Sequence, residues 1–438
     1  MADEWETSRL GDCVTHQKGF TFKSADYRPS GHPIVRVSNF TDRSIDMAEC
    51  SHLDHDAVQQ YEAYKLRHRD AVIATVGSWP TNPASVVGKT ICVPEKAEAA
   101  LLNQNAVRLR TKADLDQRFL FYLLKQPDFQ TYIVGTAQGS ASQASITLND
   151  IFGFEFQRPH LAEQKAIAAV LGALDDKIEL NRRMNATLEA MARALFQSWF
   201  VDFDPVRAKL DPAPAGPTLD PATTALFPEH LEETALGHTP KGWEVRSLDK
   251  TAHYLNGLAL QKYPPGDGAT LPVIKIAQLR KGDSIGADRC NTDLPPNYIV
   301  QDGDVLFSWS GSLEVELWCG GPGALNQHLF KVTSPEFPKW FYYLWTLYHL
   351  DEFRLIAADK ATTMGHIQRG HLTAAKVLIP PRPLLDAMTR TMSPLIDQLI
   401  ANRIQSRTLA TLRDTLLPKL LSGELSVAAA SATMEASV

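Results

Sequence analysis

Two short stretches of the chain hold residue types that could bind a metal or do acid–base chemistry. The segment "ECSHLDHDA" places Cys50, His52 and His55 within six residues, and these are zinc-ligand types. No matching second pair of ligands follows, so a solvated loop is the favoured interpretation. Glu163 and Lys165 have the Glu-x-Lys spacing of a metal-dependent nuclease, but they fall at a predicted helix start, where the helix dipole favours a glutamate. We therefore predict no catalytic residue and no metal site in this chain.

Motifs of several other enzyme classes are absent from the sequence. It has no G-x-x-x-x-G-K-[ST] phosphate loop and no Asn-Pro-Pro-aromatic or Asp-Pro-Pro-aromatic segment of an adenine methyltransferase. The nearest string, "TNPAS" (Thr81–Ser85), lacks the second proline and the aromatic residue. The string "WSGS" (Trp309–Ser312) lacks the leading glycine of a nucleophile elbow. A nuclease or a methyltransferase in its own right is kept only as an alternative.

Polar loops that recur in both halves of the chain carry side chains that can donate and accept hydrogen bonds. The loop "RVSN" (36–39) corresponds to "KIAQ" (275–278), and "GSASQAS" (139–145) corresponds to "KATTMGH" (360–366). The strings "VGSW" and "WSGS" end predicted strands near matched glycines. For each of these side chains the alternative is a structural turn or a solvent-facing position. The candidate binding residues on these loops are Arg36, Ser38, Asn39, Ser78, Ser140, Ser142, Gln143, Lys275, Gln278, Ser310, Ser312, Thr362, Thr363 and His366.

These loops belong to an internal repeat that organises the whole chain. At a constant offset of 221 residues, Asp176 matches Asp397, Asn181 matches Asn402, and "FLFYLL" (Phe119–Leu124) falls on "WFYYLW" (Trp340–Trp345). Farther upstream the match continues with small gaps, as in "DAVIATVGS" against "GDVLFSWSGS". The period is far longer than that of a solenoid repeat, so the chain contains two copies of a whole module.

Each half begins with a globular part, at residues 1–160 and 242–383. Alternating apolar residues in "PIVRVSNF" and "LPVIKIAQL" predict strands, and glycine and proline punctuate them. Short helices are expected at Gln117–Gln126 and Lys339–Tyr348. The pattern indicates two α+β domains.

Each half ends with a long predicted helix, at residues 161–204 and 384–425. Apolar residues recur at alternating spacings of three and four, which is the a/d pattern of a coiled coil. Pro394 either starts the main part of the second helix or kinks it. The predicted seam residues are Asn181, Asn185, Leu188, Leu195, Asn402, Leu409 and Leu416.

Two amides, Asn181 and Asn185, lie on the otherwise apolar seam of the first helix. Polar seam residues can fix register and partner choice at some cost in stability. The alternative is that the amides bond to water near the middle of the seam. Both interpretations are open at this point.

A linker between the two halves shapes the expected architecture. Residues 205–241 are proline-rich and long enough to return the chain along the first helix. We therefore expect the two helices to pair antiparallel, with one globular domain at each end and an internal pseudo-twofold axis. The tail, 426–438, is rich in small residues and is predicted to be disordered.

The composition describes an ordinary soluble globular protein of 438 residues. We expect no transmembrane segment, and the acidic N-terminus with its few, scattered cysteines predicts a cytoplasmic location. The net charge is −6, and in both globular segments acidic side chains match or outnumber basic ones. Any DNA contact must therefore come from a local patch, or a partner must supply phosphate-neutralising charge.

The helical segments resemble the specificity subunits of type I restriction–modification systems. The stretch "RPHLAEQKAIAAVLGALDDKIELNRRMNATLEAMARALFQSWFVDFDPV" (158–206) follows that family's pattern over about fifty residues. The segments "PKGWEVRSL" (240–248) and "LRDTLLPKLLSGEL" (412–425) are similar to the entry to its second globular domain and to its C-terminus. The resemblance covers essentially the whole chain and is strongest in the helices. In the second copy, "LLDAMTR" (384–390) departs from the family's Glu-Gln helix start.

The resemblance implies a non-catalytic subunit that binds double-stranded DNA. Each globular domain would be a target-recognition domain for one half of an asymmetric bipartite site, and the helix pair would set the spacer. Base edges are read by hydrogen-bonding side chains on exposed loops, so the candidate binding residues named above would be the candidate DNA contacts. Two methyltransferase subunits using S-adenosylmethionine would dock on the helices, and restriction/translocase subunits using ATP and Mg would join for cleavage. This chain itself would hold no cofactor. A scaffold that carries two binding domains without a DNA role is the remaining alternative.

Overall fold

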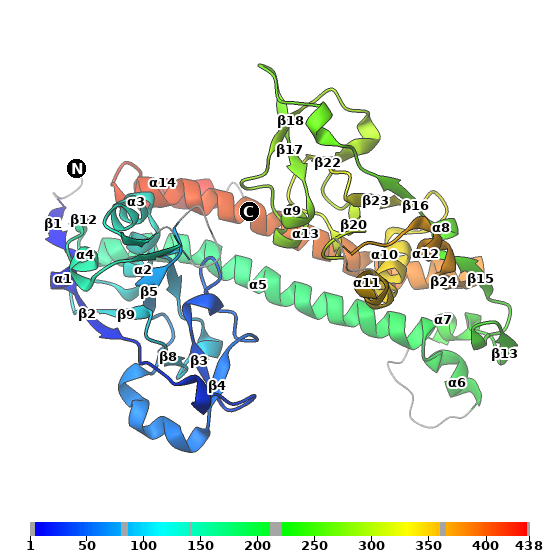
Figure 1. The fold of residues 1–438 in the computed structure, drawn as a ribbon, viewed down its shortest axis with the longest axis horizontal. Helices are drawn as coiled ribbons and strands as arrows, with labels where there is room; N and C mark the ends of the chain where they lie inside the picture. The colour runs from blue at the N-terminus through cyan, green and yellow to red at the C-terminus, as the bar shows by residue number, and fades with distance from the viewer. Residues whose placement is uncertain (1–4, 80–85, 141, 211–220, 360–364, 436–438) are drawn as a thin grey trace. The chain divides into compact units, whose positions relative to one another are not determined.

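The computed structural model describes residues 5–79, 86–140, 142–210, 221–359 and 365–435. The chain divides into two compact units. Unit 1 joins residues 1–176 to 409–438, and unit 2 is 177–408. Each unit therefore contains one globular domain, the first part of the helix that follows it, and the last part of the other long helix (Figure 1).

The globular domain of unit 1 is built on an antiparallel sheet in the order β2-β9-β5-β7. Helix α2 packs on β5, β7 and β9, and its first turn is capped by Asp116, whose carboxylate accepts from the backbone N–H groups of Arg118 and Phe119. The strands are β1 (Glu6–Arg9), β2 (Val14–Lys18), β3 (His32–Val35), β4 (Ser51–Leu53), β5 (Ala71–Ala74), β6 (Val76–Gly77), β7 (Thr90–Cys92), β8 (Leu101–Leu102), β9 (Ala106–Thr111), β10 (Gln138–Ser140), β11 (Gln143–Ser145) and β12 (Glu155–Arg158). The helices are α1 (Leu10–Cys13), α2 (Gln117–Lys125), α3 (Pro127–Gly135) and α4 (Leu148–Phe152).

The globular domain of unit 2 has an antiparallel sheet in the order β16-β23-β20-β21 and a second sheet in the order β18-β17-β22-β19. Its core is rich in aromatic side chains, including Trp340, Phe341 and Phe307. The strands are β15 (Glu244–Ser247), β16 (His253–Asn256), β17 (Thr270–Ile274), β18 (Arg289–Asn291), β19 (Ile299–Val300), β20 (Val305–Ser308), β21 (Val315–Leu317), β22 (Gly323–Leu325), β23 (Leu329–Thr333) and β24 (Lys376–Ile379). The helices are α8 (Leu248–Thr251), α9 (Ile276–Lys281), α10 (Lys339–Tyr348), α11 (Leu350–Asp359) and α12 (Arg369–Ala374).

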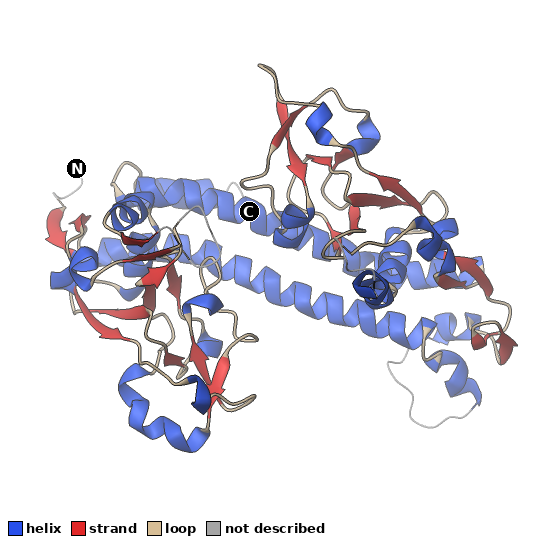
Figure 2. Cartoon of the chain, in the orientation of Figure 1, coloured by secondary structure: helices blue, strands red, loops and turns tan. Residues whose placement is uncertain are grey.

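The two domains share one topology, which confirms the predicted α+β class and the internal duplication. In unit 1 the first and last strands, β1 and β12, pair antiparallel, as β15 and β24 do in unit 2. The parallel pairing of β3 with β8 likewise recurs as β17 with β22. Figure 2 shows the same mixture of strands and short helices in both domains.

The long helices α5 (Leu161–Phe200) and α13 (Arg382–Leu421) confirm the two predicted heptad segments. Pro394 lies inside α13, so the idea that it starts the helix is wrong, although its exposed position lets the ring sit on the outer face. The predicted seam residues Asn181, Asn185, Asn402, Leu409 and Leu416 are buried, and Leu188 and Leu195 are partly buried. No helix in the described part of the chain, these two included, is apolar enough over its length to cross a membrane.

The linker and the tail contain more structure than the sequence suggested. Residues 205–241 include most of α6 (Asp204–Leu210), then α7 (Pro221–Leu226) and the hairpin β13 (Leu231–Thr234)–β14 (Gly237–Pro240), because Val206 and Phe227 are buried in the aromatic core. The predicted disorder of the tail is wrong for 427–435, which form α14 (Val427–Glu435). Its alanines favour a helix, and Ala430 is buried.

Candidate nucleic-acid interface

A polar edge of unit 1 gathers the candidates around the β10–β11 hairpin. Strand β11 pairs with β10 on one side and with β6 on the other. Ser140, Ser142 and Gln143 at the hairpin tip are exposed, and the Ser140 carbonyl accepts a 2.8 Å hydrogen bond from the Trp79 indole. Ser78 lies at the end of β6 and is buried, so the tip carries the side chains that are free to meet a ligand.

The equivalent edge of unit 2 forms where the segment after β20 meets residues 365–367. Ser310 bridges to His366, and the Gly311 N–H donates to the Gly365 carbonyl at 2.8 Å. Ser310 is buried with its hydroxyl 2.9 Å from His328 Nδ1, whereas Ser312 is exposed. Thr362 and Thr363 lie outside the described residues.

The two edges are joined in the same way, as the repeat predicted for their sequences. In unit 1 the Ile146 N–H donates to the Thr75 carbonyl at 2.9 Å, and in unit 2 the Ile367 N–H donates to the Trp309 carbonyl at 2.9 Å. Two polar loops that are distant in sequence thus lie side by side in each domain. Their base-reading role stays a prediction for every candidate residue.

The other candidate loops are short turns with one structural amide each. The Arg36 N–H donates to Asn39 Oδ1 at 2.9 Å, and the Lys275 N–H donates to Gln278 Oε1 at 3.3 Å. Asn39 is only 2% exposed, and its amide nitrogen donates to the Glu49 carbonyl, so the turn uses this side chain fully. Ser38 and Lys275 are exposed, and Lys275 forms an ion pair with Asp288.

A hollow of about 430 Å³ beside Ser312 contains two arginines that the sequence reasoning did not single out. The Arg280 and Arg354 side chains are 59% and 46% exposed, and both approach Glu314, at 3.9 and 3.2 Å. Exposed arginines beside a candidate reading edge suit phosphate contacts. Arg280 follows Gln278 by two residues, so its proximity to a candidate loop was the available signal.

The seam amides bond to one another across the two helices. Asn402 Nδ2 donates to Asn185 Oδ1 at 2.9 Å, and Asn181 Nδ2 donates to Gln405 Oε1 at 2.9 Å. Asn185 Nδ2 reaches the Leu399 carbonyl at 3.3 Å. These contacts show that the helix segments of unit 2 run antiparallel. They also favour amide pairing over hydration as the reason for polar seam positions, because the amide groups of Asn185 and Asn402 and the amide nitrogen of Asn181 bond to the facing helix, although Asn181 Oδ1 has no partner among the described residues.

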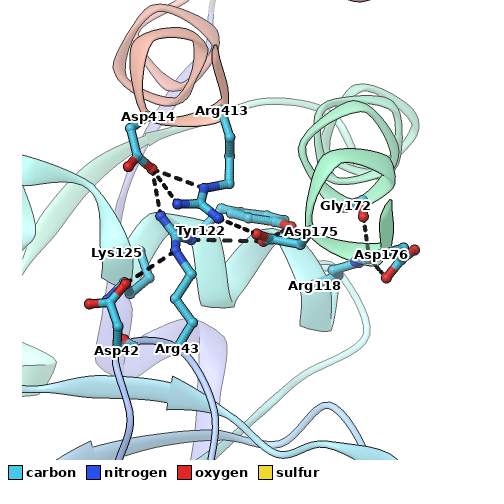
Figure 3. A network of polar contacts seen from close by, with 10 residues as sticks. All are labelled: Asp42, Arg43, Arg118, Tyr122, Lys125, Gly172, Asp175, Asp176, Arg413 and Asp414. Carbon is cyan, nitrogen blue, oxygen red and sulfur yellow. Dashed lines mark hydrogen bonds and ion pairs between the residues drawn. The ribbon is translucent and has the colours of Figure 1, made fainter. Parts of the chain in front are cut away.

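In unit 1, a network of charged side chains holds the globular domain on the helices (Figure 3). Arg413 of α13 is buried and donates to Asp175 of α5 at 2.5 Å and to Asp414 at 2.9 Å. Arg43, from the domain, donates to Asp414 at 2.7 Å, and the Tyr122 hydroxyl donates to Asp175 at 2.7 Å. Figure 3 shows Arg43 reaching up from the domain to the side chains of both helices.

Arg118 and Lys125 of helix α2 make further polar contacts beside this joint between the domain and the helices. Arg118 donates to Asp176 at 2.6 Å and to the Gly172 carbonyl at 2.9 Å. Lys125 donates to the Asp42 carbonyl at 2.9 Å, and burial lowers the pKa of Lys125 to about 8. Across the domain–helix contacts, the domain thus supplies Arg43 and Arg118 and the helices supply Asp414 and Asp176, whereas Arg413 is a cation of the helix itself.

In unit 2 the joint has the opposite arrangement of charge. Arg407 of α13 forms two 2.7 Å hydrogen bonds to Asp302 of the domain. Arg403 of α13 contacts Glu316 of the domain at 3.2 Å and Glu189 of α5 at 2.8 Å. The Arg407 hydrogen bonds hold the pKa of Asp302 below its ordinary value.

This chain is similar in sequence to proteins of known role. A family model described as the type I restriction modification DNA specificity domain matches residues 2–190. The specificity subunit of the type I restriction enzyme MjaIX from Methanocaldococcus jannaschii is 27% identical over 336 residues, 74% of this chain and 73% of that protein. The HindI specificity subunit from Haemophilus influenzae is 25% identical, over 70% of this chain and 77% of that protein. Residues 2–190 thus match the specificity-domain family, and over most of its length the chain is similar to specificity subunits of type I restriction–modification systems.

A solved structure supports the fold of this chain. The type I restriction–modification S subunit from M. genitalium superposes with a TM-score of 0.54 at 15% identity, covering 95% of this chain and 96% of that one. At that identity the likeness concerns the fold alone. It agrees with two α+β domains and two long helices in one chain.

The histidine, cysteine and acidic side chains of the described residues form no group of three or more metal ligands. Cys50, His52 and His55 therefore do not meet as a zinc site there. Burial raises the pKa of the Cys50 thiol to about 11 and that of Cys92 to about 12, so neither is a reactive thiolate.

Proposed function

We propose that each globular domain of this specificity subunit reads one half of a bipartite DNA site. The observation that carries the proposal is the pair of matched polar edges, each built by two loops in the same topology. The side chains at these edges differ, with exposed Ser142 and Gln143 in unit 1 against exposed Ser312 and half-buried His366 in unit 2. Different hydrogen-bonding groups at equivalent edges support an asymmetric site, because donors and acceptors decide which bases are bound.

The helices α5 and α13 would set the unread spacer between the half-sites. Each has 40 residues, and at about 1.5 Å per residue this gives a rod on the order of 60 Å. Half-sites about one helical turn apart are separated by roughly 34 Å. The amides at Asn181, Asn185 and Asn402 support a fixed register, since an axial slip would separate their paired donors and acceptors.

Partner subunits would supply the chemistry and much of the charge. Two methyltransferase subunits with S-adenosylmethionine would flip and methylate an adenine in each half-site. Restriction/translocase subunits with ATP and Mg would add cleavage. The net charge of −6 supports a division of labour in which partners neutralise many phosphates and this chain supplies base contacts.

The first test measures adenine methylation across a genome in cells that express this chain with its methyltransferase subunit. A control strain lacks only this chain. We expect a new motif with two specified halves and a fixed gap, and its loss in the control. Formation of the complex with an active methyltransferase but without a new motif would contradict the proposal.

Edge variants then test the two domains separately. Ser142→Ala with Gln143→Ala should relax discrimination at one half-site, and Ser312→Ala with His366→Ala should relax it at the other. Each good base contact is worth about 1–3 kcal/mol of discrimination. The readout is the methylated fraction at the motif and at its single-base variants. Thr187→Ala on the exposed face of α5 is the matched control, and relaxation of the same half-site by both edge variants would contradict the assignment.

A further inference from the structure

Equivalent positions on the two long helices carry unlike pairs of residues. In unit 1, Asp175 of α5 and Arg413 of α13 form a buried ion pair at 2.5 Å. At the repeat offset of 221 residues, their counterparts are Ile396 and Ala192. In unit 2 both counterparts are buried at 2% exposure in the same hydrophobic cluster. At this position unit 1 therefore has an ion pair between the helices, whereas unit 2 has two apolar side chains.

The next residue on each helix adds a second difference. Asp414 of α13 accepts from Arg43 of the unit 1 domain at 2.7 Å. Its counterpart on α5 is Arg193, which lines a hollow of about 210 Å³ in unit 2 together with Glu314 and Glu316. Each helix thus presents the charge that is opposite to the charge of the domain it contacts.

In a duplicated chain, each long helix could also pair with the same helix of a second chain, which would be a wrong partner. If α5 paired with its own copy, Ala192 would replace Arg413 and leave Asp175 without its buried partner. Arg193 would also replace Asp414 and face Arg43. Breaking a buried ion pair by losing one partner is strongly unfavourable.

The second half meets the same difficulty with opposite signs. If α13 paired with its copy, Arg413 would replace Ala192 in an aromatic cluster that includes Phe196. Asp414 would replace Arg193 beside Glu314 and Glu316. The central amides do not discriminate in this way, because Asn181 and Asn402 are equivalent and an amide can pair with its own kind.

We propose that Ala192–Arg193 and Arg413–Asp414 form a pairing code that makes α5 and α13 partners of each other within one chain. The code disfavours pairing of either helix with its copy in a second chain. It is independent of DNA recognition, because its readouts are molecular mass and thermal stability.

The exchange variant tests the code directly in the full chain. It combines Ala192→Arg, Arg193→Asp, Arg413→Ala and Asp414→Arg, so composition and net charge do not change. The pairs within one chain become mismatched, and the pairs between copies become matched. We expect the wild type to be monomeric and the exchange variant to form dimers or larger assemblies. Light scattering and sedimentation should cover roughly a hundredfold range of concentration, because a tether keeps the two helices of one chain at an effective concentration on the order of millimolar.

A matched control exchanges charge where no partner is contacted. Arg183→Asp with Asp397→Arg conserves composition on the same two helices at exposed positions. It should remain monomeric, with the thermal midpoint of the wild type. The proposal is overturned if the wild type already self-associates, or if the exchange variant is monomeric with an unchanged midpoint.

A rescue pair keeps the proposal testable if the exchange variant does not fold. Asp414→Arg places a further arginine beside Arg43 and Arg413, and we expect a lower thermal midpoint. Adding Arg43→Asp restores an opposite charge across the joint and should recover part of the lost midpoint. Failure of Arg43→Asp to recover any stability would also overturn the code.

Discussion

The two domain–helix joints of this chain lie in corresponding halves of the repeat, but they use different helix positions and have opposite electrostatics. In unit 1, the domain brings Arg43 and Arg118 to helix carboxylates. In unit 2, helix α13 brings Arg403 and Arg407 to the domain carboxylates Glu316 and Asp302. The backbone topology was kept after duplication, whereas the side chains at the joints diverged.

This difference shows that different residues encode the fold of the domains and the pairing of domains with helices. The apolar seam and the strand order can be the same in both halves because they fix the shape. The charged joints are different, and they decide which helix end accepts which domain. Such discrimination by unfavourable alternatives is a common source of specificity.

The largest effect is expected at the buried joint of unit 1. Arg413→Ala removes the partner of Asp175 from a site where the arginine is 5% exposed. The stability of unit 1 should fall by about 3 kcal/mol, because a carboxylate would remain without its buried counter-charge. Hydrogen exchange of the 409–421 segment reads this loss within unit 1. Adding Asp175→Asn should recover part of the lost stability. Equal losses in the single and the double variant would show that the unpaired carboxylate is not the cause.

The next effect concerns the amide pair on the seam of unit 2. Asn402→Leu leaves the amide oxygen of Asn185 without its donor, and we expect a loss of about 1–3 kcal/mol from this unsatisfied buried group. Replacing both Asn185 and Asn402 with leucine should restore the lost stability, because an apolar pair has no unmet hydrogen bond. Urea unfolding of the two variants gives the coupling energy. A double variant as unstable as the single would refute the pairwise explanation.

The joint of unit 2 should respond less than that of unit 1. Arg407→Ala removes two hydrogen bonds to Asp302, but the two side chains are 37% and 24% exposed. Solvent screening reduces the value of such a pair, so a loss of roughly 1 kcal/mol is expected. The same hydrogen-exchange measurement on 399–408 tests it. A loss equal to that of Arg413→Ala would show that burial does not separate the two joints.

The smallest effect is a dependence on pH at Asp302. Its folded pKa lies below the ordinary value of 3.8, because Arg407 donates to the carboxylate. This contribution to stability is therefore complete above the unfolded pKa and is lost as pH falls through the folded pKa. The difference in thermal midpoint between wild type and Asp302→Asn should be constant between about pH 5 and 7 and shrink below about pH 4. A difference that grows on acidification would contradict this sign.

The long helices and the duplication could be predicted from sequence because they rest on local periodicity. The heptad seam and the absence of proline predicted a helix over 161–204, and the observed α5 (Leu161–Phe200) begins at the same residue and ends four residues earlier. Repeat matching also indicated that the loops at 139–145 and 360–366 occupy equivalent places. The interpretation that Pro394 starts the second helix was wrong, because an exposed proline can be accommodated within a long packed helix.

The joints could not be predicted because their partners are far apart in sequence. Arg43 and Asp414 are separated by 371 residues, and neither belongs to a recognisable motif. Burial likewise decides that Asn39 serves a turn, while Ser142 at a hairpin tip stays exposed. The tail was misjudged because small residues suit both disorder and a helix, and packing of Ala430 is not visible in sequence.

The most direct measurement replaces residues 1–160 with the corresponding domain of another type I specificity subunit and maps the methylated motif. If each domain reads its own half-site and the helices set the gap, only one half of the motif will change. The other half and the spacer length will stay the same. A motif that changes in both halves, or in neither while the complex remains active, would contradict the division of the chain into two independent readers.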